Sequence, residues 1–483
     1  MTRSRTVGGQ GAARNHSKAV GMSSSFSGTV MHPSSCTIAV LGAGPAGTVT
    51  ALGLHRLGYQ VIVLGEPRHF QAVEGVSARV VSALQQAALE HAMAGILPVS
   101  RRLAHWNGEQ RAANSEYLVD RQRFDEGLWA DLQAAGVRTI RARVGRVHER
   151  PDGRWCMEAR EGGGEARSWT ADFLVEARGR LAPHAGPAQR GPQTLSLLCQ
   201  WQGQSVPADH GTAIESLPDG WAWMARLPDG RCYWQWTLDV KATPLPARAA
   251  LPAWCAERRE TLLARQFFGA SDLDAGRQAS VVARPSEPIR ALVPVQTNMI
   301  RVGDAAMAVD PLSGNGIFQS LSSALQAPAV IHTMRAAPAR VDLAAEFHQR
   351  RITQLFERFC RIGRDFYAME SRWPAHPFWN GRSQWPDDKP AHDVSGPGVW
   401  PDIGRGPALC GSEIIETDLV VTPEQPLGIW QLDGEPLAPI VRAVMAGQSG
   451  VLDALPEERR GNIVRWLRQH GLPVSPGDVS ANR

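Results

Sequence analysis

The pattern of hydrophobic and polar residues near the beginning of the chain predicts a strand–helix–strand unit. Residues 38–41 form a short apolar, β-branched run, which is typical of a strand buried on both faces. A helix is expected from about Pro45 to Leu57, because Pro45 is tolerated in a first turn and Gly58 follows the last turn. Residues 60–64 supply a second strand. This order predicts an α/β fold with a parallel sheet.

The turn between the first strand and the helix carries the sequence GAGPAG. Gly42 would permit the tight turn, and Gly44 would let the backbone approach a pyrophosphate. Ala46 and Gly47 lie in the first helical turn, where the lack of a side chain at Gly47 would let the helix pack on the strand. The N–H groups and the dipole of the helix N-terminus would bind the pyrophosphate. The segment therefore predicts a Rossmann-type dinucleotide site.

An acidic residue roughly 20 positions further on binds the ribose hydroxyl groups in such units. Glu66 lies 19 positions after Gly47 and is the candidate, although Gly65 occupies the position directly after the second strand. We therefore expect Glu66 to contact the adenosine end of a dinucleotide cofactor.

A second glycine-rich segment, GDAAMAVDPLSGNGI, comes after strand-like residues 299–302. Asp304 follows that strand, where its carboxylate could accept hydrogen bonds from a ribityl chain. Pro311 starts a turn of small residues that would expose backbone N–H groups, and a helix over about residues 313–334 would point its positive end at a flavin ring. The cofactor-binding candidates of this segment are Gly303, Asp304, Pro311, Gly314, Gly316 and Ile317.

Residues 191–284, between the two halves of the predicted cofactor domain, have the pattern of an antiparallel β-rich insert. The tetrapeptide LPDG occurs at residues 217–220 and again at 227–230, and each copy is a strong turn signal. Trp221 and Trp223 occupy alternate positions between the two turns. Aromatic residues at this spacing are either the core of a sheet or one wall of a substrate pocket, so both are substrate-binding candidates.

The rest of the chain shows three further patterns. A long helix is expected over residues 342–370, a segment rich in proline and tryptophan follows, and the tail has the pattern of a small α+β module similar to a winged helix. This module either only stabilises the protein or docks a protein substrate. The predicted parts are a disordered segment (1–35), the cofactor domain (36–190 and 285–372), the β-rich substrate domain (191–284), a linker (373–412) and the small C-terminal domain (413–475).

The composition is that of a globular protein, with 43% hydrophobic and 20% charged residues. The net charge of +4 is too small to suggest a nucleic-acid partner, and no apolar run approaches the length of a membrane span. Seven scattered cysteines without a CxxC pair predict reduced thiols in a cytoplasmic protein, and no metal site is expected. Residues 1–35 lack the apolar core of a secretory signal, and Met22 or Met31 could be the true start.

Four stretches together resemble the flavoprotein monooxygenase and flavin-dependent halogenase superfamily. Besides the glycine-rich segments, VDRQRFD at residues 119–125 is similar to the family's VDRxxFD helix start, and ADFLVEARGR at 171–180 is similar to its ADxLVxAxGR strand. The resemblance covers about residues 36–372 and implies a bound FAD, with Arg121 near it. Arg178 replaces the small Ser or Thr that is usual in the last motif, and the family's fuller Asp-Gly fingerprint is missing, and together these departures argue against direct use of NADPH.

The halogenases of this superfamily pass hypohalous acid to a lysine shortly after the first Rossmann unit. The chain has three lysines, Lys18, Lys241 and Lys389, and none lies in the matching stretch at residues 73–80. Arginine cannot supply the neutral amine that this chemistry needs. The family's WxWxIP motif is present only in part, at residues 221–225. Halogenation is therefore disfavoured.

Residues 73–79 and 310–325 are similar to one group of the superfamily, the monooxygenases that build tryptophylquinone cofactors, above all the one serving quinohaemoprotein amine dehydrogenase. The resemblance implies that Glu74 and Arg79 are catalytic residues beside the isoalloxazine or the substrate, with Ser77 between them as a substrate-binding candidate. The alternative for Glu74 and Arg79 is a salt bridge at the start of a surface helix.

A flavin held in this way reacts with oxygen to give a C4a-hydroperoxide, which hydroxylates electron-rich rings. The predicted function is an FAD-dependent monooxygenase that hydroxylates a tryptophan side chain of a partner polypeptide during cysteine tryptophylquinone biogenesis. It would use O2, with NAD(P)H or a separate flavin reductase as the electron source. The alternatives are a small-molecule aromatic hydroxylase, a flavin-dependent tryptophan halogenase and a non-catalytic flavin-binding protein.

Overall fold

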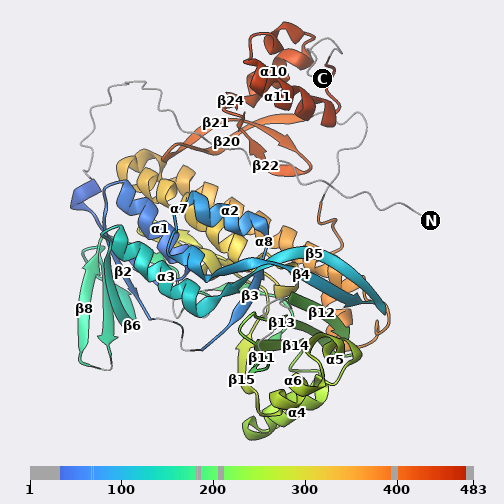
Figure 1. Cartoon of the computed structure of the whole chain (residues 1–483). Coiled ribbons are helices and arrows are strands. Elements are labelled where there is room, and N and C mark those ends of the chain that lie inside the picture. The colour runs from blue at the N-terminus through green and yellow to red at the C-terminus, as the bar shows by residue number, and fades with distance from the viewer. Residues whose placement is uncertain are drawn as a thin grey trace. The chain divides into compact units, whose positions relative to one another are not determined.

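The computed structural model describes residues 33–66, 68, 70–162, 164–180, 182, 187–204, 211–392 and 401–474. These residues form two compact units (Figure 1): those up to 391, together with residues 411–413, make the larger unit, and the others make the smaller one. Of the segment predicted to be disordered, residues 1–32 lie outside the described part of the chain, and Pro33–Ser35 form a 3-10 turn. Each unit has a hydrophobic core of its own.

An eight-stranded sheet, in the order β17-β18-β9-β1-β2-β6-β7-β8, forms the centre of the cofactor domain. Its strands are β1 (Thr37–Leu41), β2 (Gln60–Gly65), β6 (Arg138–Glu149), β7 (Trp155–Glu161), β8 (Ala166–Ala171), β9 (Phe173–Glu176), β17 (Val295–Gln296) and β18 (Met299–Arg301). The neighbours β18, β9, β1, β2 and β6 run parallel, so their carboxyl ends share one edge of the sheet. The predicted α/β fold is confirmed, and ligands of open α/β sheets bind at this edge.

The two glycine-rich segments are brought together by a tight contact between two helices. Helix α1 starts at the first segment and α7 at the second, and a Cβ on Gly53 of α1 would lie only 2.5 Å from Cγ of Pro328, a proline inside α7. Thr50 also donates a hydrogen bond to the Ala324 carbonyl oxygen at 3.4 Å. The helices of this domain are α1 (Pro45–Arg56), α2 (Ala78–Gln86), α3 (Arg121–Ala134), α7 (Gly316–Ala336), α8 (Val341–Ala368) and α9 (Pro377–Ser383).

A second eight-stranded sheet has the order β15-β11-β14-β13-β12-β4-β5-β3. Its strands are β3 (Val73–Val76), β4 (Ile96–Trp106), β5 (Glu109–Asp120), β11 (Leu195–Gln202), β12 (Gly211–Leu217), β13 (Gly220–Arg226), β14 (Arg231–Leu238) and β15 (Ser280–Pro285). The two LPDG turns connect β12 to β13 and β13 to β14, as their sequences predict. Strands β3, β4 and β5 precede the predicted insert and join it through a parallel β4–β12 pair.

Strand β13 is buried along its whole length and sends alternate side chains to opposite faces of this sheet. Trp221 and Trp223 enter a core cluster that also contains Tyr367 of α8 and is flanked by Leu312. Met224 enters the opposite cluster, which the green helices at the lower end of Figure 1 cover. Those helices are α4 (Leu251–Arg258), α5 (Leu262–Phe268) and α6 (Ala270–Ala275).

A small three-stranded sheet is built from three separate stretches of the chain. It consists of β10 (Ala188–Arg190), β16 (Ile289–Ala291) and β19 (Met307–Ala308), all antiparallel. Because β19 begins three positions after Asp304 in the second glycine-rich segment, this sheet holds that segment against the residues before and after the insert.

The segment predicted as a linker contains regular structure. Helix α9 lies within it, and its Phe378 and Trp379 are fully buried in the cluster around Trp221. Strand β20 also lies within it and belongs to the smaller unit. Residues 393–400 of the predicted linker lie outside the described part.

Among its described residues, the smaller unit combines strands of two to ten residues with two α-helices, in agreement with the α+β pattern of its sequence. Its hydrophobic core contains Val420, Val441 and Trp466, which come from a strand and both helices. Its elements are β20 (Asp402–Cys410), β21 (Glu413–Thr422), β22 (Gln425–Ile429), β23 (Gln431–Leu432), β24 (Glu435–Pro436), α10 (Leu437–Met445) and α11 (Glu457–Gln469).

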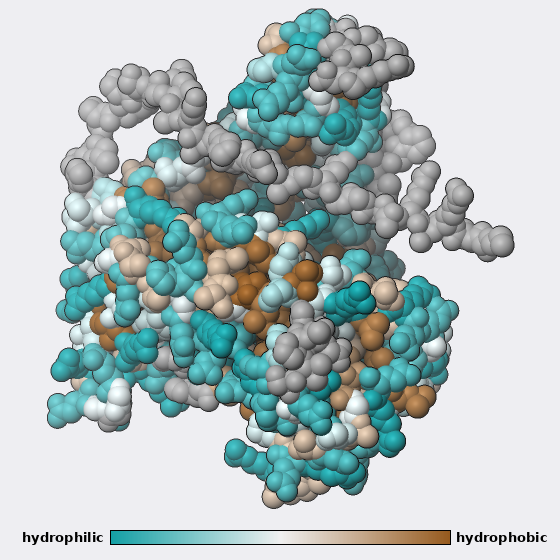
Figure 2. Space-filling model, in the orientation of Figure 1, coloured by the Kyte–Doolittle hydropathy of each residue, from teal (hydrophilic) through white to brown (hydrophobic). Residues whose placement is uncertain are grey.

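The surface seen in Figure 2 is mixed in character. Hydrophobic residues gather near the middle of this face, where helix α2 lies in Figure 1, and hydrophilic residues surround them. Among the described residues, no helix is both long and apolar enough to cross a bilayer.

Candidate functional site

The first glycine-rich turn adopts the geometry that a bound pyrophosphate requires. Gly42 has a φ of +106°, and a Cβ there would lie 2.5 Å from the Ala177 carbonyl oxygen. A Cβ on Gly47 would collide with the backbone of Gly42. At Gly44 the situation is opposite: apart from Gly44 and its two chain neighbours, no described residue has an atom within 4 Å of a Cβ position. The open space at Gly44, between two crowded glycines, fits the close approach of a phosphate.

Helix α1 begins with N–H groups that a ligand could bind. Gly44 is its N-cap, and no described side chain caps the helix. The N–H of Thr48 donates to the Gly44 carbonyl oxygen at 2.9 Å, which leaves the N–H groups earlier in the turn without helical partners. Glu66 is exposed directly after β2, whose last residue is Gly65. The pyrophosphate and ribose roles of these residues remain predictions, but the local geometry suits them.

Asp304 lies next to this turn. Gly303 has a φ of +58°, and a Cβ on it would lie 2.6 Å from Cβ of Ala46 in the first turn of α1. The N–H of Gly303 donates to Ser323 of α7 at 2.9 Å. The two glycine-rich segments therefore meet at Ala46 and Gly303, and Asp304, the residue after Gly303, lies close to the N-terminus of α1.

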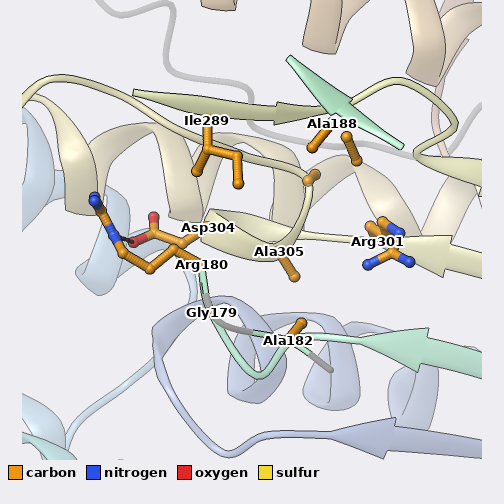
Figure 3. A pocket seen from close by; sticks show the side chains of 10 residues that line it. Gly179, Arg180, Ala182, Ala188, Ile289, Arg301, Asp304 and Ala305 are labelled. Carbon is orange, nitrogen blue, oxygen red and sulfur yellow. Dashed lines mark ion pairs between the residues drawn. The ribbon is translucent and has the colours of Figure 1, made fainter. Parts of the chain in front are cut away.

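A small pocket opens beside Asp304 (Figure 3). Gly179 and Ala182 lie on one side of it, and Ala188 and Ile289 lie on the other. Small side chains thus line much of the pocket, with charged groups between them. The lining residues are Gly179, Arg180, Ala182, Ala188, Ile289, Ala291, Arg301, Asp304, Ala305 and Ala306.

The electrostatic surroundings of Asp304 suit a carboxylate that accepts hydrogen bonds from the hydroxyl groups of a ligand. Enclosure by the protein raises the pKa of its carboxyl group, while Arg180 and Ser320 act in the opposite direction. The Arg180 Nε lies 4.0 Å from Oδ2, as the dashed line in Figure 3 marks, and the Ser320 hydroxyl donates to Oδ1 at 3.0 Å. The side chain is still 35% exposed, so a ligand in the pocket can reach its oxygens.

The turn that would face the flavin ring is a 3-10 helix over Pro311–Ser313. Gly314 follows it with a φ of +63°, and α7 starts at Gly316 instead of near residue 313 as predicted. A left-handed residue interrupts a helix, which explains the later start. Apart from adjacent residues and the backbone of the first turn of α7, no described residue has an atom within 4 Å of a Cβ position on Gly314 or Gly316, so the backbone before Ile317 is open to a ligand.

Glu74 and Arg121 form one charged group. Arg121 donates to Glu74 Oε1 at 2.5 Å and to Asp125 at 2.7 Å, and its own side chain is only 8% exposed. Burial alone would lower the pKa of Arg121, but the carboxylates of Glu74 and Asp125 raise it by more than burial lowers it. The net shift is upward, so the guanidinium stays charged. The Glu74 side chain is 38% exposed and is held by this ion pair. The structure therefore brings together one predicted catalytic residue and the predicted cofactor-binding arginine.

Arg79 and Ser77 are exposed at the beginning of α2. Trp221 and Trp223 are 2% and 9% exposed, and both lie in the core cluster flanked by Leu312 of the Pro311–Ser313 turn. The sheet core explains the burial of both tryptophans, and contact with a substrate remains a prediction for them.

Three residues of this region were not among the predicted site residues. Arg180 and Asp310 lie inside the quoted motifs, but nothing in the sequence separates them from neighbouring polar residues. Tyr367 donates to Asp310 across 57 positions and carries no local signal at all. Only the packing of α8 against the Pro311–Ser313 turn reveals this contact.

Comparison with known proteins places the chain. No family model matches it. It is 50% identical to a solved structure described as the peptidyl tryptophan dihydroxylase QhpG, essential for tryptophylquinone cofactor biogenesis, with a TM-score of 0.79 over 91% of this chain and all of that chain. The chain belongs to the QhpG family of flavin-dependent monooxygenases. It is therefore an oxidoreductase, and the superfamily resemblance of its motifs is confirmed.

More distant members of the superfamily agree with this placement. The tryptophan 2-halogenase of Chondromyces crocatus is 25% identical over 72% of this chain and 71% of its own length. The putative FAD-dependent oxidoreductase LodB of Marinomonas mediterranea is 22% identical over 71% and 95%. The halogenase CmlS shares the fold, with a TM-score of 0.70 and 17% identity over 90% of this chain and 95% of that one.

Proposed function

We propose that the chain is an FAD-dependent monooxygenase that oxygenates a tryptophan side chain of a partner polypeptide during tryptophylquinone cofactor biogenesis. The observation that carries the proposal is the 50% identity to QhpG over the whole of that chain. QhpG is described as acting on a peptidyl tryptophan, so the substrate here would be a protein side chain. The cysteine tryptophylquinone product and the cytoplasmic location remain predictions.

The residues at the carboxyl edge of the parallel sheet fit FAD. The α1 N-terminus and the open position at Gly44 would hold its pyrophosphate, and Asp304 would accept hydrogen bonds from the ribityl hydroxyls. The turn at Pro311–Ser313 would present the open backbone of Gly314 and Gly316 to the ring. When bound, the reduced flavin would activate O2 and thereby provide an electrophilic oxygen. Its electrons would come from NAD(P)H or a separate flavin reductase.

The chain's own task would be to orient the indole and to exclude water. The cluster that holds Trp221 and Trp223 is apolar and is flanked by Leu312 of the turn that would face the flavin. A dry wall of this kind favours transfer of oxygen to a ring over loss of the oxidant to water. Few side chains would need to move protons, because an indole ring is already electron-rich.

The smaller unit would dock the partner polypeptide, and we interpret its fold as winged-helix-like. A protein substrate can bind through contacts remote from the reacting ring, and such contacts orient the ring for reaction. Strand β20 belongs to this unit, so a deletion should begin after Ala391 and not at residue 413. We expect the shortened chain to retain FAD and to lose affinity for the partner. Unchanged affinity would leave the unit a purely stabilising role.

Halogenation is the alternative that the comparisons raise, because a tryptophan 2-halogenase is among the relatives. The absence of lysine between residues 18 and 241 argues against it. The test is to incubate holoenzyme, reductant, O2 and bromide with a tryptophan-bearing peptide and, separately, with free tryptophan. Oxygen added to the peptide supports the proposal. Bromine added to either substrate, or oxygen added only to the free amino acid, contradicts it.

A further inference from the structure

Three buried side chains link the substrate sheet to the flavin-facing turn. The Trp221 indole N–H on β13 donates to the Tyr367 hydroxyl at 3.2 Å. The Tyr367 hydroxyl on α8 donates to the two oxygens of Asp310 at 3.0 and 3.1 Å. Asp310 Oδ1 also accepts the backbone N–H of Leu312 at 2.9 Å. A continuous hydrogen-bonded chain therefore runs from β13 to the backbone of the turn.

The chain of hydrogen bonds is closed to solvent. Trp221 and Tyr367 are each 2% exposed, and Asp310 is 4% exposed. The Tyr367 ring packs edge-on against Phe378 and Trp379 of α9, with centroid distances of 5.7 and 5.9 Å. Its position is thus fixed by packing, and each member of the chain has the partner that a buried polar group needs. Loss of one member would leave the others without a substitute partner from water.

Asp310 controls the shape of the turn. Its side chain caps the 3-10 helix Pro311–Ser313, and its carbonyl oxygen accepts the Ser313 hydroxyl at 2.7 Å. Burial raises the pKa of the Asp310 carboxyl, while the Leu312 N–H, Arg382 and the Tyr367 hydroxyl oppose that rise. The Tyr367 hydroxyl contributes two of the contacts that keep this carboxyl oriented toward Leu312.

We propose that Tyr367 is a positioning residue that holds the Asp310–Gly316 turn ready for the flavin by tying it to Trp221 of the substrate sheet. This inference rests on the proposed FAD site. An ordered turn presents its backbone without a further loss of conformational freedom, so its order should appear as affinity for FAD. The tie also links the sheet that would face the substrate to the turn that would face the cofactor.

The test is the affinity of the apoprotein for FAD, measured by quenching of flavin fluorescence, with the visible circular dichroism of the bound flavin as a second readout. Removal of a buried hydrogen bond in Tyr367→Phe should raise the Kd for FAD about tenfold and change the dichroism. The matched control is Tyr233→Phe, a fully buried tyrosine of the same cluster whose hydroxyl contacts Arg231 at 3.4 Å. It should leave both readouts at their wild-type values.

Variants of Asp310 separate positioning from charge and remain informative if Tyr367→Phe does not fold. Asp310→Asn keeps the oxygen that accepts from both Leu312 and Tyr367, so its Kd should stay within about twofold of wild type. Asp310→Ala removes that oxygen and should resemble Tyr367→Phe, and the two together should be no worse than either alone. Additive losses, a Tyr367→Phe Kd equal to wild type, or an Asp310→Asn as weak as Asp310→Ala would overturn the proposal. A wild-type protein that never binds FAD would instead refute the proposed function.

Discussion

The carbonyl oxygen of Gly42 lies 1.9 Å from the place that a Cβ on Gly47 would occupy. No side chain can fit there, so helix α1 can pack this closely against the end of β1 only with glycine at position 47. The same turn leaves open space at Gly44. The contact between Gly42 and Gly47 thus leaves the start of α1 beside open space, which is the arrangement that a pyrophosphate needs.

The difference between these glycines predicts how their variants behave. Gly44→Val adds atoms to open space, so the protein should fold normally, but the side chain would fill the place of the pyrophosphate. We expect flavin content to fall below about one-tenth of wild type while the melting temperature stays unchanged. The control is Gly461→Ala on α11, which should keep its flavin. A Cβ at this position also meets open space among the described residues. Full flavin content in folded Gly44→Val would contradict the assigned site.

Asp304 should show a conflict between stability and cofactor binding. Its carboxyl pKa is raised by burial, so above that pKa the ionised group lowers the stability of the folded apoprotein. Asp304→Asn removes this cost, and the apoprotein should melt at a higher temperature at pH 7. It should also bind FAD about tenfold more weakly, because an uncharged acceptor holds a hydroxyl less strongly. Calorimetry of the apoprotein and a flavin titration measure the two effects. A lower melting temperature together with unchanged affinity would refute the assignment.

His348 predicts a loss of stability in mild acid. Burial lowers its pKa from 6.5 to about 4, and its Nε2 donates to the Arg301 carbonyl at 2.9 Å. Because the folded pKa lies below the unfolded value, the unfolded chain binds more protons as the pH falls from about 6.5 towards 4. The larger unit should lose about 2 kcal/mol between pH 7 and pH 5 through this group. His348→Gln keeps a donor for the carbonyl and should reduce that loss, as urea unfolding at both pH values can show. An equal loss in the variant would exclude His348 as the cause.

The parts of the structure that local sequence signals encode were predictable. The β–α–β unit, the two LPDG turns and the helix α8 follow from glycines, prolines and hydrophobic spacing within a few residues. The parallel β4–β12 pair was not, because it joins Arg101 to Gly211 across an interval with no local signal. The surroundings of Trp221 and Trp223 were not predictable either. Their alternation shows that both side chains lie on the same face of the sheet, but only tertiary packing shows which residues that face contacts. Tyr367 could not be linked to Asp310 from the sequence, since the link depends on how α8 lies on the turn.

Glu74 and Arg79 differ in how the structure constrains them. Glu74 is paired with the buried Arg121, whereas Arg79 is exposed at the start of α2. If both line the flavin or substrate, Glu74→Gln and Arg79→Ala should lower turnover more than about twofold while flavin stays bound. Gln86→Ala, an exposed residue at the end of the same helix, is the control. If both variants keep turnover within twofold of wild type, Glu74 has only a structural role in its salt bridge with Arg121, and Arg79 is only a surface residue.

The central claim is that the acceptor is a tryptophan within a polypeptide. The most direct measurement is tandem mass spectrometry of a tryptophan-bearing partner polypeptide after incubation with the holoenzyme, a reductant and O2. We predict the gain of one or two oxygen atoms on a single tryptophan, dependent on both enzyme and O2. An unmodified partner, together with oxygenation of a free phenol or indole under the same conditions, would contradict the claim.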